Sequence, residues 1–250
     1  MEKLSLTIIT LNEEDKIRDA LESAKWADEI VVVDSGSTDK TLEICREYTD
    51  KVYTNKWPGF VAQKNFATDK ATYRWILSID ADERVSPELA EEIRQKLSSP
   101  SADAYALPRR VFYLGRWINH SGWYPDYKVR LFDREKCRWE GEQVHETVRV
   151  KGHTGYLKGD LTHYTFDSIE DHIKTMNSYT SLAAHEYTKN RPITKTDLTF
   201  RPFFTFFKSY FLKKGYRDGM PGFIISTAAA CHVFLKYAKT WELKNVKEKK

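Results

Sequence analysis

The chain has 250 residues, a formal net charge of +4, and 41% hydrophobic and 30% charged residues. This composition excludes an intrinsically disordered protein, and the length suits one large domain or one domain with an appendage. The N-terminus runs directly into an apolar strand pattern without the features of a signal peptide, so we expect a cytoplasmic protein. No window of about 18 uninterrupted apolar residues predicts a transmembrane helix.

Charge is distributed unevenly along the chain. Residues 201–250 contain 11 Lys or Arg and 3 Asp or Glu, a net charge of +8, which leaves −4 for residues 1–200. The C-terminal fifth is therefore the basic part of the protein. Cys45, Cys137 and Cys231 lie far apart, which is typical of reduced structural thiols rather than of a disulfide framework or a zinc site.

Strand and helix patterns alternate through the first third of the chain. Apolar strands are predicted at 4–11, 30–33, 52–53 and 76–79, and helices at 17–24, 41–45 and 60–67. We expect Asn12 to be the N-cap of the first helix. The alternation predicts an α/β fold with a mostly parallel sheet and helices on both of its faces.

Polar side chains stand where three of these strands end. Asn12 follows the first strand, Asp34 ends the second, and Asp80-Ala81-Asp82 ends the last. Ligands of open parallel sheets bind beyond the carboxyl ends of the strands. Asp80 and Asp82 lie on one side of the strand, where they could share Mg2+ with a substrate diphosphate, with Glu83 as a supporting charge. The alternative is a solvated acidic turn before a helix that starts at Ser86-Pro87.

The order and spacing of these motifs resemble the nucleotide-binding half of family 2 glycosyltransferases, which have the Rossmann-like GT-A fold. In that family successive strands end in Thr-x-Asn, Val-Asp-x-Gly-Ser-x-Asp-x-Thr and Asp-x-Asp, and this chain has them at 10–12, 33–41 and 80–82. A nucleotidyltransferase is the neighbouring alternative, but such enzymes carry a Gly-rich loop where this chain has Asn-Glu-Glu.

The resemblance implies a nucleotide-sugar donor and a Mg2+ or Mn2+ cofactor. Asp82 is then the direct metal ligand, and Asp80 lies at the ribose or the metal. Lys64 is expected near the diphosphate, and Asp34 is expected to hydrogen-bond the base. The full set expected around the nucleotide is Thr10, Leu11, Asn12, Glu14, Asp34, Ser35, Lys64 and Asp80.

Residues 100–165 are expected to form the acceptor half of a GT-A domain that spans 1–165, with 1–99 as the nucleotide-binding half. Strands are predicted at 105–110 and 128–132, and the loop between them is rich in rings and polar groups. Rings stack on pyranose faces and polar groups bind hydroxyls. We therefore expect an acceptor or sugar site at Trp117, His120, Trp123 and Tyr124. The alternative is a packed loop with both tryptophans as core anchors.

Transfer with inversion needs a base that takes the proton of the acceptor hydroxyl. We favour Glu146, with Asp126 and Glu142 as further candidates. A carboxylate beside His145 in a partly buried aromatic loop is expected to have a raised pKa, which suits a base. His145 could also ligate the metal. The alternative is that these are surface charges on a hairpin.

The run Gly-x-x-Val-His-Glu at 141–146, with residues 122–132 and 213–222, resembles one branch of the family, the bacterial lipopolysaccharide-core glucosyltransferases. This resemblance implies a UDP-sugar, with glucose as the sugar, and a lipid-linked or lipopolysaccharide-core acceptor. Polyprenyl phosphate, another polysaccharide or a protein are the alternative acceptors.

Residues 166–250 are predicted to be a helical, aromatic and basic extension, with helices at 168–190, 200–216 and 222–237. Residues 200–217 are apolar on nearly every face and flanked by Lys and Arg, which is typical of a helix lying on an anionic membrane. We therefore expect a peripheral position on the inner face of the bacterial inner membrane. The alternatives are a core helix or a homodimer seam. A nucleic-acid-binding module is the non-enzyme alternative, but no recognition motif supports it, and we expect no nucleic-acid partner.

Overall fold

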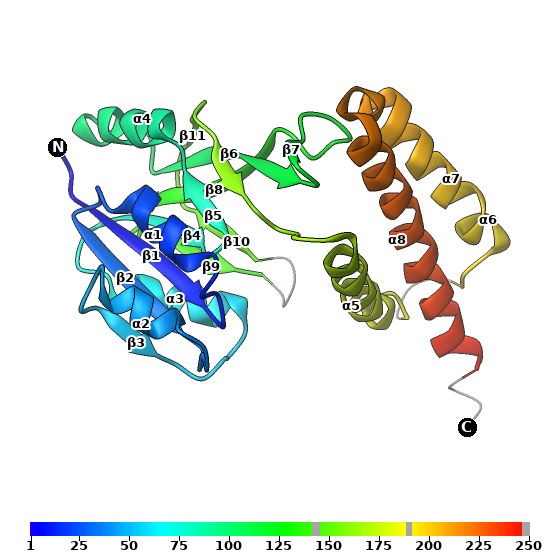
Figure 1. The fold of residues 1–250 in the computed structure, drawn as a ribbon, viewed down its shortest axis with the longest axis horizontal. Helices are drawn as coiled ribbons and strands as arrows, with labels where there is room; N and C mark the ends of the chain where they lie inside the picture. The colour runs from blue at the N-terminus through cyan, green and yellow to red at the C-terminus, as the bar shows by residue number, and fades with distance from the viewer. Residues whose placement is uncertain (142–145, 189–191, 247–250) are drawn as a thin grey trace. The chain divides into compact units, whose positions relative to one another are not determined.

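The structure, a computed structural model, describes residues 1–141, 146–188 and 192–246 (Figure 1). They form two compact units. Unit 1 comprises Met1–Arg110 and Asp126–Tyr164, and unit 2 comprises Val111–Pro125 and Thr165–Lys250. The boundary that we placed after residue 165 differs from this division by one residue. Residues 111–125, which we grouped with the acceptor half, belong to unit 2, because Val111, Tyr113 and Ile118 pack with Ile225 of the C-terminal helix.

Unit 1 is built on a mixed sheet with the strand order β3-β2-β1-β4-β8-β6-β12-β5. The first four strands are parallel, β8 is antiparallel to β4, and β6 is antiparallel to β8. The strands of this path are β1 (Leu4–Thr10), β2 (Glu29–Asp34), β3 (Val52–Thr54), β4 (Trp75–Asp80), β5 (Glu83–Val85), β6 (Ala104–Tyr113), β8 (Asp126–Asp133) and β12 (Leu161–His163). The short strand β11 (Thr154–Tyr156) pairs with β6 in unit 1, whereas β7 (Arg116–Trp117) pairs with Phe112 and Tyr113, the end of β6 that belongs to unit 2. A separate hairpin consists of β9 (Cys137–Glu140) and β10 (Thr147–Val150).

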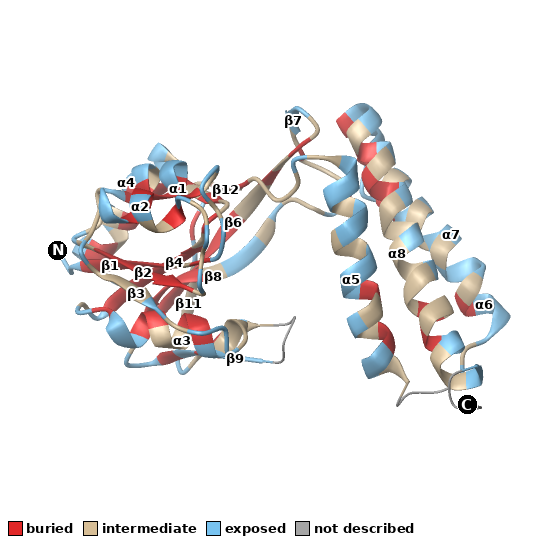
Figure 2. Cartoon of the chain, turned by 60° about the horizontal axis from the view of Figure 1, so that its bottom comes forward, coloured by how far each residue is buried: buried red, intermediate tan, exposed pale blue. Residues whose placement is uncertain are grey.

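Helices cover both faces of this sheet, as the alternating pattern predicts (Figure 2). They are α1 (Ile17–Ala24), α2 (Thr41–Arg46), α3 (Phe60–Lys70) and α4 (Pro87–Ser98). Val32 and Leu77 pack into one core with α1, α2 and α4, whereas the adjacent Val31 and Ile76 pack into a second core on the opposite face. Successive strand residues point to opposite faces, so the continuous apolar runs of β2 and β4 follow from burial on both sides.

The predicted N-cap of α1 is wrong. The helix begins at Ile17 with Lys16 as its N-cap, and Asn12 lies outside it in the left-handed backbone region at φ 53°. The side-chain oxygen of Asn12 accepts a hydrogen bond from the backbone N–H of Thr38 instead. The helix start named in the alternative of an acidic turn is present, because α4 has Pro87 in its first turn and Ser86 Oγ accepts from Leu89 N–H at 3.1 Å.

Unit 2 is helical. It contains α5 (Ile169–Tyr187), α6 (Lys195–Leu198), α7 (Phe200–Phe207), the π-helical turn η1 (Lys208–Leu212), the 3-10 turn η2 (Gly215–Asp218) and α8 (Gly219–Asn245). Both α5 and α7 pack against α8. The three predicted helices are present, but α8 is longer than residues 222–237, and the predicted helix at 200–216 changes to a π-turn and then a 3-10 turn.

Burial differs along the predicted helix at 200–217. No residue of α7 is buried, whereas Ser209 and Gly215 in the turns after it are, and the alternatives of a core helix or a homodimer seam stay predictions. An 18-residue window of the segment Gly215–Asn245 has a mean hydropathy of 1.2, and the segment is long and apolar enough to cross a membrane, which differs from the expectation that no transmembrane helix occurs. Length and composition alone do not make it a membrane span, because a helix packed between α5 and α7 meets the same criterion.

Candidate active site

The polar strand ends meet at one edge of the sheet. Thr10 is paired with Asp34 across β1 and β2, and Ile9 is paired with Asp80 across β1 and β4. The carboxyl ends of the three parallel strands therefore lie side by side. The convergence expected from the sequence is confirmed, and it gives this edge of unit 1 three neighbouring polar positions.

The loops after β1 and β2 are joined by their own polar groups. Asn12 donates its backbone N–H to Ser37 Oγ at 2.8 Å, and its side-chain oxygen accepts from Thr38 N–H at 2.8 Å. Asp34 is fully buried, and its Oδ2 accepts from the N–H groups of Gly36 and Ser37 at 2.7 and 2.9 Å. Asp34 thus holds the turn in shape, while its contact with a base stays a prediction.

Two further candidates link this turn to its surroundings. Glu14 Oε2 accepts from the N–H of Lys40 at 2.9 Å, and Ser35 Oγ accepts from the Nε2 of Gln63 at 3.0 Å. Gln63 is a buried residue of α3 that the sequence did not single out. Leu11 stands at the tip of the same edge with 48% of its surface exposed. The expected nucleotide edge therefore combines a rigid polar turn with one exposed apolar side chain.

Lys64 of α3 faces two of the predicted carboxylates. Its Nζ lies 3.0 Å from Asp80 Oδ1 and 3.3 Å from Glu146 Oε1. The ammonium also lies 4.6 Å from the ring centroid of Trp139, and only 2% of the Lys64 side chain is exposed. A buried ammonium requires paired charge, and both carboxylates supply it. The structure thus brings the predicted diphosphate residue and the favoured base together, from positions 82 residues apart.

Arg130 of β8 completes this cluster, and the sequence analysis missed it. Its Nη2 lies 2.6 Å from Asp80 Oδ2 and 2.8 Å from Glu83 Oε1. Burial alone would raise the pKa of Asp80, but Arg130 and Lys64 outweigh it and hold that pKa well below its usual range. Glu83 also accepts the backbone N–H of Asp80 at 3.0 Å, in line with a supporting charge. A lone Arg between the apolar residues Val129 and Leu131 was the available signal.

Asp126 has a different environment from Glu146. Its carboxylate pairs with Arg109 at 2.7 Å and with Lys128 at 3.2 Å. Burial would raise the pKa of Asp126, but the two cations outweigh it and lower this pKa. A general base works best with a pKa near the operating pH, so the lowered value disfavours Asp126 for this role.

The side chain of Asp82 contacts His163, which the sequence analysis also missed. The Nε2 of His163 lies 3.0 Å from Asp82 Oδ2. No group of three or more His, Cys, Asp or Glu residues that could hold a metal occurs in the described ranges. Mg2+ usually takes one or two protein carboxylates and completes its shell with substrate phosphates and water. The Asp82 carboxylate fits that mode of binding, whereas Glu142 and His145 lie outside the described residues.

The four predicted acceptor residues belong to unit 2. Trp123 packs against Tyr113 at a centroid distance of 5.5 Å, in a cluster with Phe166 and His172. This packing favours the alternative of a core anchor for Trp123. Trp117 meets Phe112 edge to face at a centroid distance of 5.1 Å. The Nδ1 of His120 lies 3.0 Å from the carboxylate of the buried Asp218, and Tyr124 is half-buried. Their contact with an acceptor stays a prediction.

Comparison with known proteins decides the family. The model of glycosyl transferase family 2 matches residues 5–211, which include every strand-end motif described above. The chain belongs to glycosyl transferase family 2. It is a glycosyltransferase, and its mixed, mostly parallel sheet with flanking helices and a helical C-terminal part is the GT-A fold that the motifs predict.

Similar proteins extend over nearly the whole chain. An uncharacterized glycosyltransferase of Rickettsia typhi is 32% identical, covering 97% of this chain and 88% of its own length. The lipopolysaccharide core biosynthesis glycosyltransferase LpsC of Rhizobium meliloti is 31% identical, covering 96% and 92%. Among solved structures, S. aureus TarS 1–349 in complex with UDP-GlcNAc covers 98% of this chain and 92% of its own, at 15% identity and a TM-score of 0.49.

Proposed function

We propose that this glycosyltransferase is inverting and metal-dependent, and that it transfers a hexose, glucose, from a UDP-sugar to a lipid-linked or lipopolysaccharide-core saccharide. The observation that carries the proposal is the polar cluster at the carboxyl ends of β1, β2 and β4, where buried Lys64 faces Asp80 and Glu146. The name of the Rhizobium relative supports the acceptor class. The motif resemblance supports the UDP-sugar.

On the donor side, the proposed roles follow from charge. Asp82 would hold Mg2+ or Mn2+, which when bound neutralises the diphosphate as the bond between sugar and oxygen breaks. Lys64 would place its ammonium against the same diphosphate, and Asp80 keeps Lys64 and Arg130 in fixed positions. The turn held by Asp34 would border the nucleoside. Preorganised charges of this kind stabilise the leaving group without reorganisation during the reaction.

On the acceptor side, Glu146 is the proposed base. It takes the hydroxyl proton as the acceptor oxygen bonds to C1 of the sugar, while the electrons of the broken bond leave with the nucleoside diphosphate. Glu146→Gln should keep donor binding and lower turnover by about 100-fold or more, in the usual range for a lost general base. Glu140→Gln, an exposed carboxylate on β9, is the control. Unchanged turnover of Glu146→Gln would remove it from this role.

The proposal as a whole is tested by donor hydrolysis. A panel of nucleotide sugars is incubated with Mg2+ or Mn2+ and the wild-type chain, Asp82→Asn, or the control Asp50→Asn, which changes an exposed loop carboxylate. We expect hydrolysis of a UDP-hexose by the wild type and the control, and a loss of about 100-fold or more in Asp82→Asn. Hydrolysis of no donor, or equal hydrolysis by all three proteins, would contradict the proposal.

We further propose that the enzyme acts in the cytoplasm at the inner face of the bacterial inner membrane. A lipid-linked acceptor lies at that surface, so an enzyme held there meets it without extracting it from the lipid. Support comes from the basic C-terminal fifth of the chain and from the exposed apolar side chains of α7. Binding to anionic lipid scales with such positive charge and apolar area.

A further inference from the structure

Exposed rings form a stripe along α7 and η1 of unit 2. The aromatic stripe consists of Phe200, Phe204, Phe207 and Phe211, which are 59%, 46%, 39% and 49% exposed. Residues three or four apart share a helix face. The centroids of Phe200 and Phe204 are 6.1 Å apart, and those of Phe207 and Phe211 are 5.2 Å apart. Contiguous exposed apolar surface marks a site of interaction with another surface.

The exposed charged residues of the segment that carries the aromatic stripe, positions 200–223, are all basic. The basic residues of this stretch are Arg201, Lys208, Lys213, Lys214 and Arg217, and all are exposed. Asp218 is the single acidic residue between positions 200 and 223, and it is buried. The surface therefore presents rings and cations together, with no exposed carboxylate from the same segment. This combination complements an anionic, partly apolar surface.

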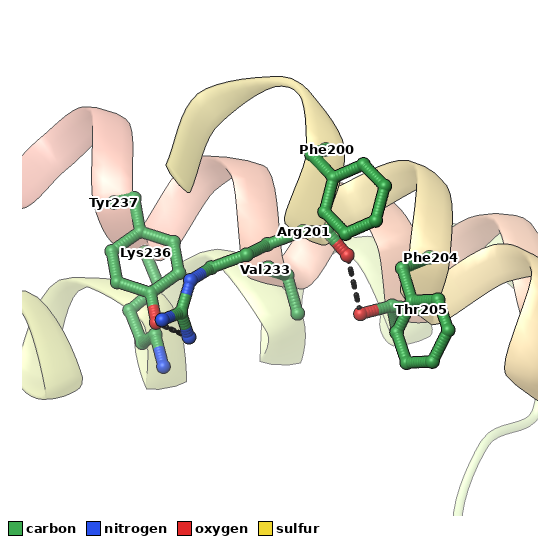
Figure 3. Close-up of a pocket in the computed structure, with 7 residues that line it drawn as sticks. All are labelled: Phe200, Arg201, Phe204, Thr205, Val233, Lys236 and Tyr237. Atoms are coloured by element: carbon green, nitrogen blue, oxygen red, sulfur yellow. Dashed lines mark hydrogen bonds between the residues drawn. The ribbon is translucent and has the colours of Figure 1, made fainter. Parts of the chain in front are cut away.

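A pocket of about 200 Å3 opens between α7 and α8, at the end of the stripe formed by Phe200 and Phe204 (Figure 3). Arg201 and Lys236 both line it. Arg201 Nε pairs with Asp197 at 2.7 Å, and its guanidinium donates to the Tyr237 hydroxyl at 3.2 Å.

Lys236 is the cation of this pocket whose charge is not neutralised by a carboxylate of the described residues. Its ammonium lies 4.3 and 4.6 Å from the ring centroids of Tyr187 and Tyr237, and no carboxylate of the described residues pairs with it. Lys236 is half-buried and belongs to the residues that line the pocket. A half-buried cation beside exposed rings is complementary to a phospholipid, because the cation can pair with the phosphate and the rings can contact the acyl chains.

We propose that the aromatic stripe and this pocket dock the enzyme on a bilayer that contains anionic phospholipid, with the rings at the acyl boundary and Lys236 at a headgroup phosphate. A second copy of the chain would also cover the rings. However, a twofold interface would set the same cations against each other, and like charges at an interface oppose association. The inference deepens the proposed function, because a lipid-linked acceptor lies at the same surface.

The test is co-sedimentation of the full chain with vesicles of phosphatidylglycerol and phosphatidylcholine, compared with pure phosphatidylcholine. We expect at least tenfold tighter binding to the anionic vesicles, weakening as salt is raised. Phe204→Ser combined with Phe207→Ser should weaken this binding at least tenfold. Lys236→Gln should weaken it about fivefold, the effect of one cation near an anionic surface, and Lys236→Arg should restore it.

The matched control is Tyr156→Ser, which removes a 66% exposed ring from unit 1 and should bind as the wild type does. The inference is overturned if the wild type does not sediment with anionic vesicles, or if the stripe variant binds like the control. A wild-type dimer in light scattering that the stripe variant splits, without vesicle binding, would assign the stripe to a second copy. Resistance of bound protein to alkaline carbonate would assign α8 to the membrane interior instead.

Failure of this inference and failure of the proposed function are distinguishable. Binding to vesicles needs no donor and no transfer. Protection of the chain by UDP and Mn2+ against thermal unfolding needs no vesicle. Each result therefore stands whichever way the other falls.

Discussion

The two units of this chain differ in which side chains have an unfavourable environment. These are buried charged residues in unit 1 and exposed aromatic residues in unit 2. Unit 1 buries charged side chains, because Lys64, Glu83 and Arg130 are each nearly or fully inaccessible to solvent. Their ion pairs, which also involve Asp80 and Glu146, have distances of 2.6 to 3.3 Å. Unit 2 exposes rings, and no residue of α7 is buried. Figure 2 shows the buried residues concentrated in the strands of the sheet and sparse along the C-terminal helices.

The contrast separates two causes for departing from the ordinary rule of apolar inside and polar outside. A buried ion cluster is no gain in stability over well-packed apolar residues, so its retention points to a use for the charge. An exposed aromatic surface is likewise unfavourable in water unless another surface covers it. The proposed function explains the buried charge by a charged donor, and the proposed docking explains the exposed rings by a lipid surface.

The largest expected effect compares a ring from each unit. Phe132 is completely buried in the core of unit 1, whereas Phe203 of α7 is 67% exposed. Phe132→Ala should lower the free energy of unfolding by about 3–5 kcal/mol, because it leaves a cavity. Phe203→Ala should change it by less than about 0.5 kcal/mol. Urea titration measures both, and equal losses would mean that α7 is packed as tightly as the sheet.

A second comparison removes one arginine from a buried pair and one from an exposed pair. Arg130→Met leaves Asp80 and Glu83 without their shared cation, so we expect a loss of about 3 kcal/mol. Arg138→Met breaks a two-bond pair with Asp69 that is half exposed, so its loss should stay below about 1 kcal/mol. The same titration gives both values. If Arg138→Met lowered the free energy of unfolding as much as Arg130→Met, burial of the Arg130 ion pairs would not account for their effect on stability.

The smallest of the three effects depends on pH. Burial alone would raise the pKa of Glu29, but hydrogen bonds from Lys51, Ser5 and Thr72 lower it to about 2. A lowered pKa stabilises the fold above the unfolded value of about 4.3, and this stabilisation is lost as the pH falls toward about 2. Glu29→Gln should therefore lower the free energy of unfolding by about 2 kcal/mol at neutral pH. This loss should become smaller as the pH falls below about 4.3. If the loss of unfolding free energy in Glu29→Gln were independent of pH, the negative charge of Glu29 would not be its cause.

The sequence was informative wherever the fold follows from local patterns. Because parallel strands end at one edge, the positions of Asn12, Asp34 and Asp80-Asp82 along the chain were enough to predict that the strand ends they follow meet. The same reasoning predicted helices on both faces of the sheet. The exposed rings of α7 followed from a segment that is apolar all round and flanked by Lys and Arg.

Contacts between distant segments could not be predicted from one sequence. Arg130 reaches Asp80 because β8 is inserted antiparallel beside β4, with Leu77 opposite Leu131. His163 comes from a strand 81 residues after Asp82. No local pattern specifies either strand pairing, and a charged residue in an apolar strand was the only hint at Arg130.

Tertiary contacts also overrode a local preference. Asn12 is a favourable N-cap residue, but its side chain is engaged by the turn after β2, and α1 begins five residues later without it. The capping rule describes what a side chain can do for its own helix. It does not describe a competing partner brought in from another strand.

The most direct measurement of the central claim is the binding of UDP to the wild-type chain and to Asp82→Asn by calorimetry, with and without Mn2+. If the strand-end cluster of unit 1 is a metal and diphosphate site, UDP binds the wild type at least tenfold more tightly with Mn2+ than without it. In Asp82→Asn this dependence on metal should disappear while the fold is retained. UDP affinity that is the same with and without Mn2+, or a metal effect that persists in Asp82→Asn, would contradict the account.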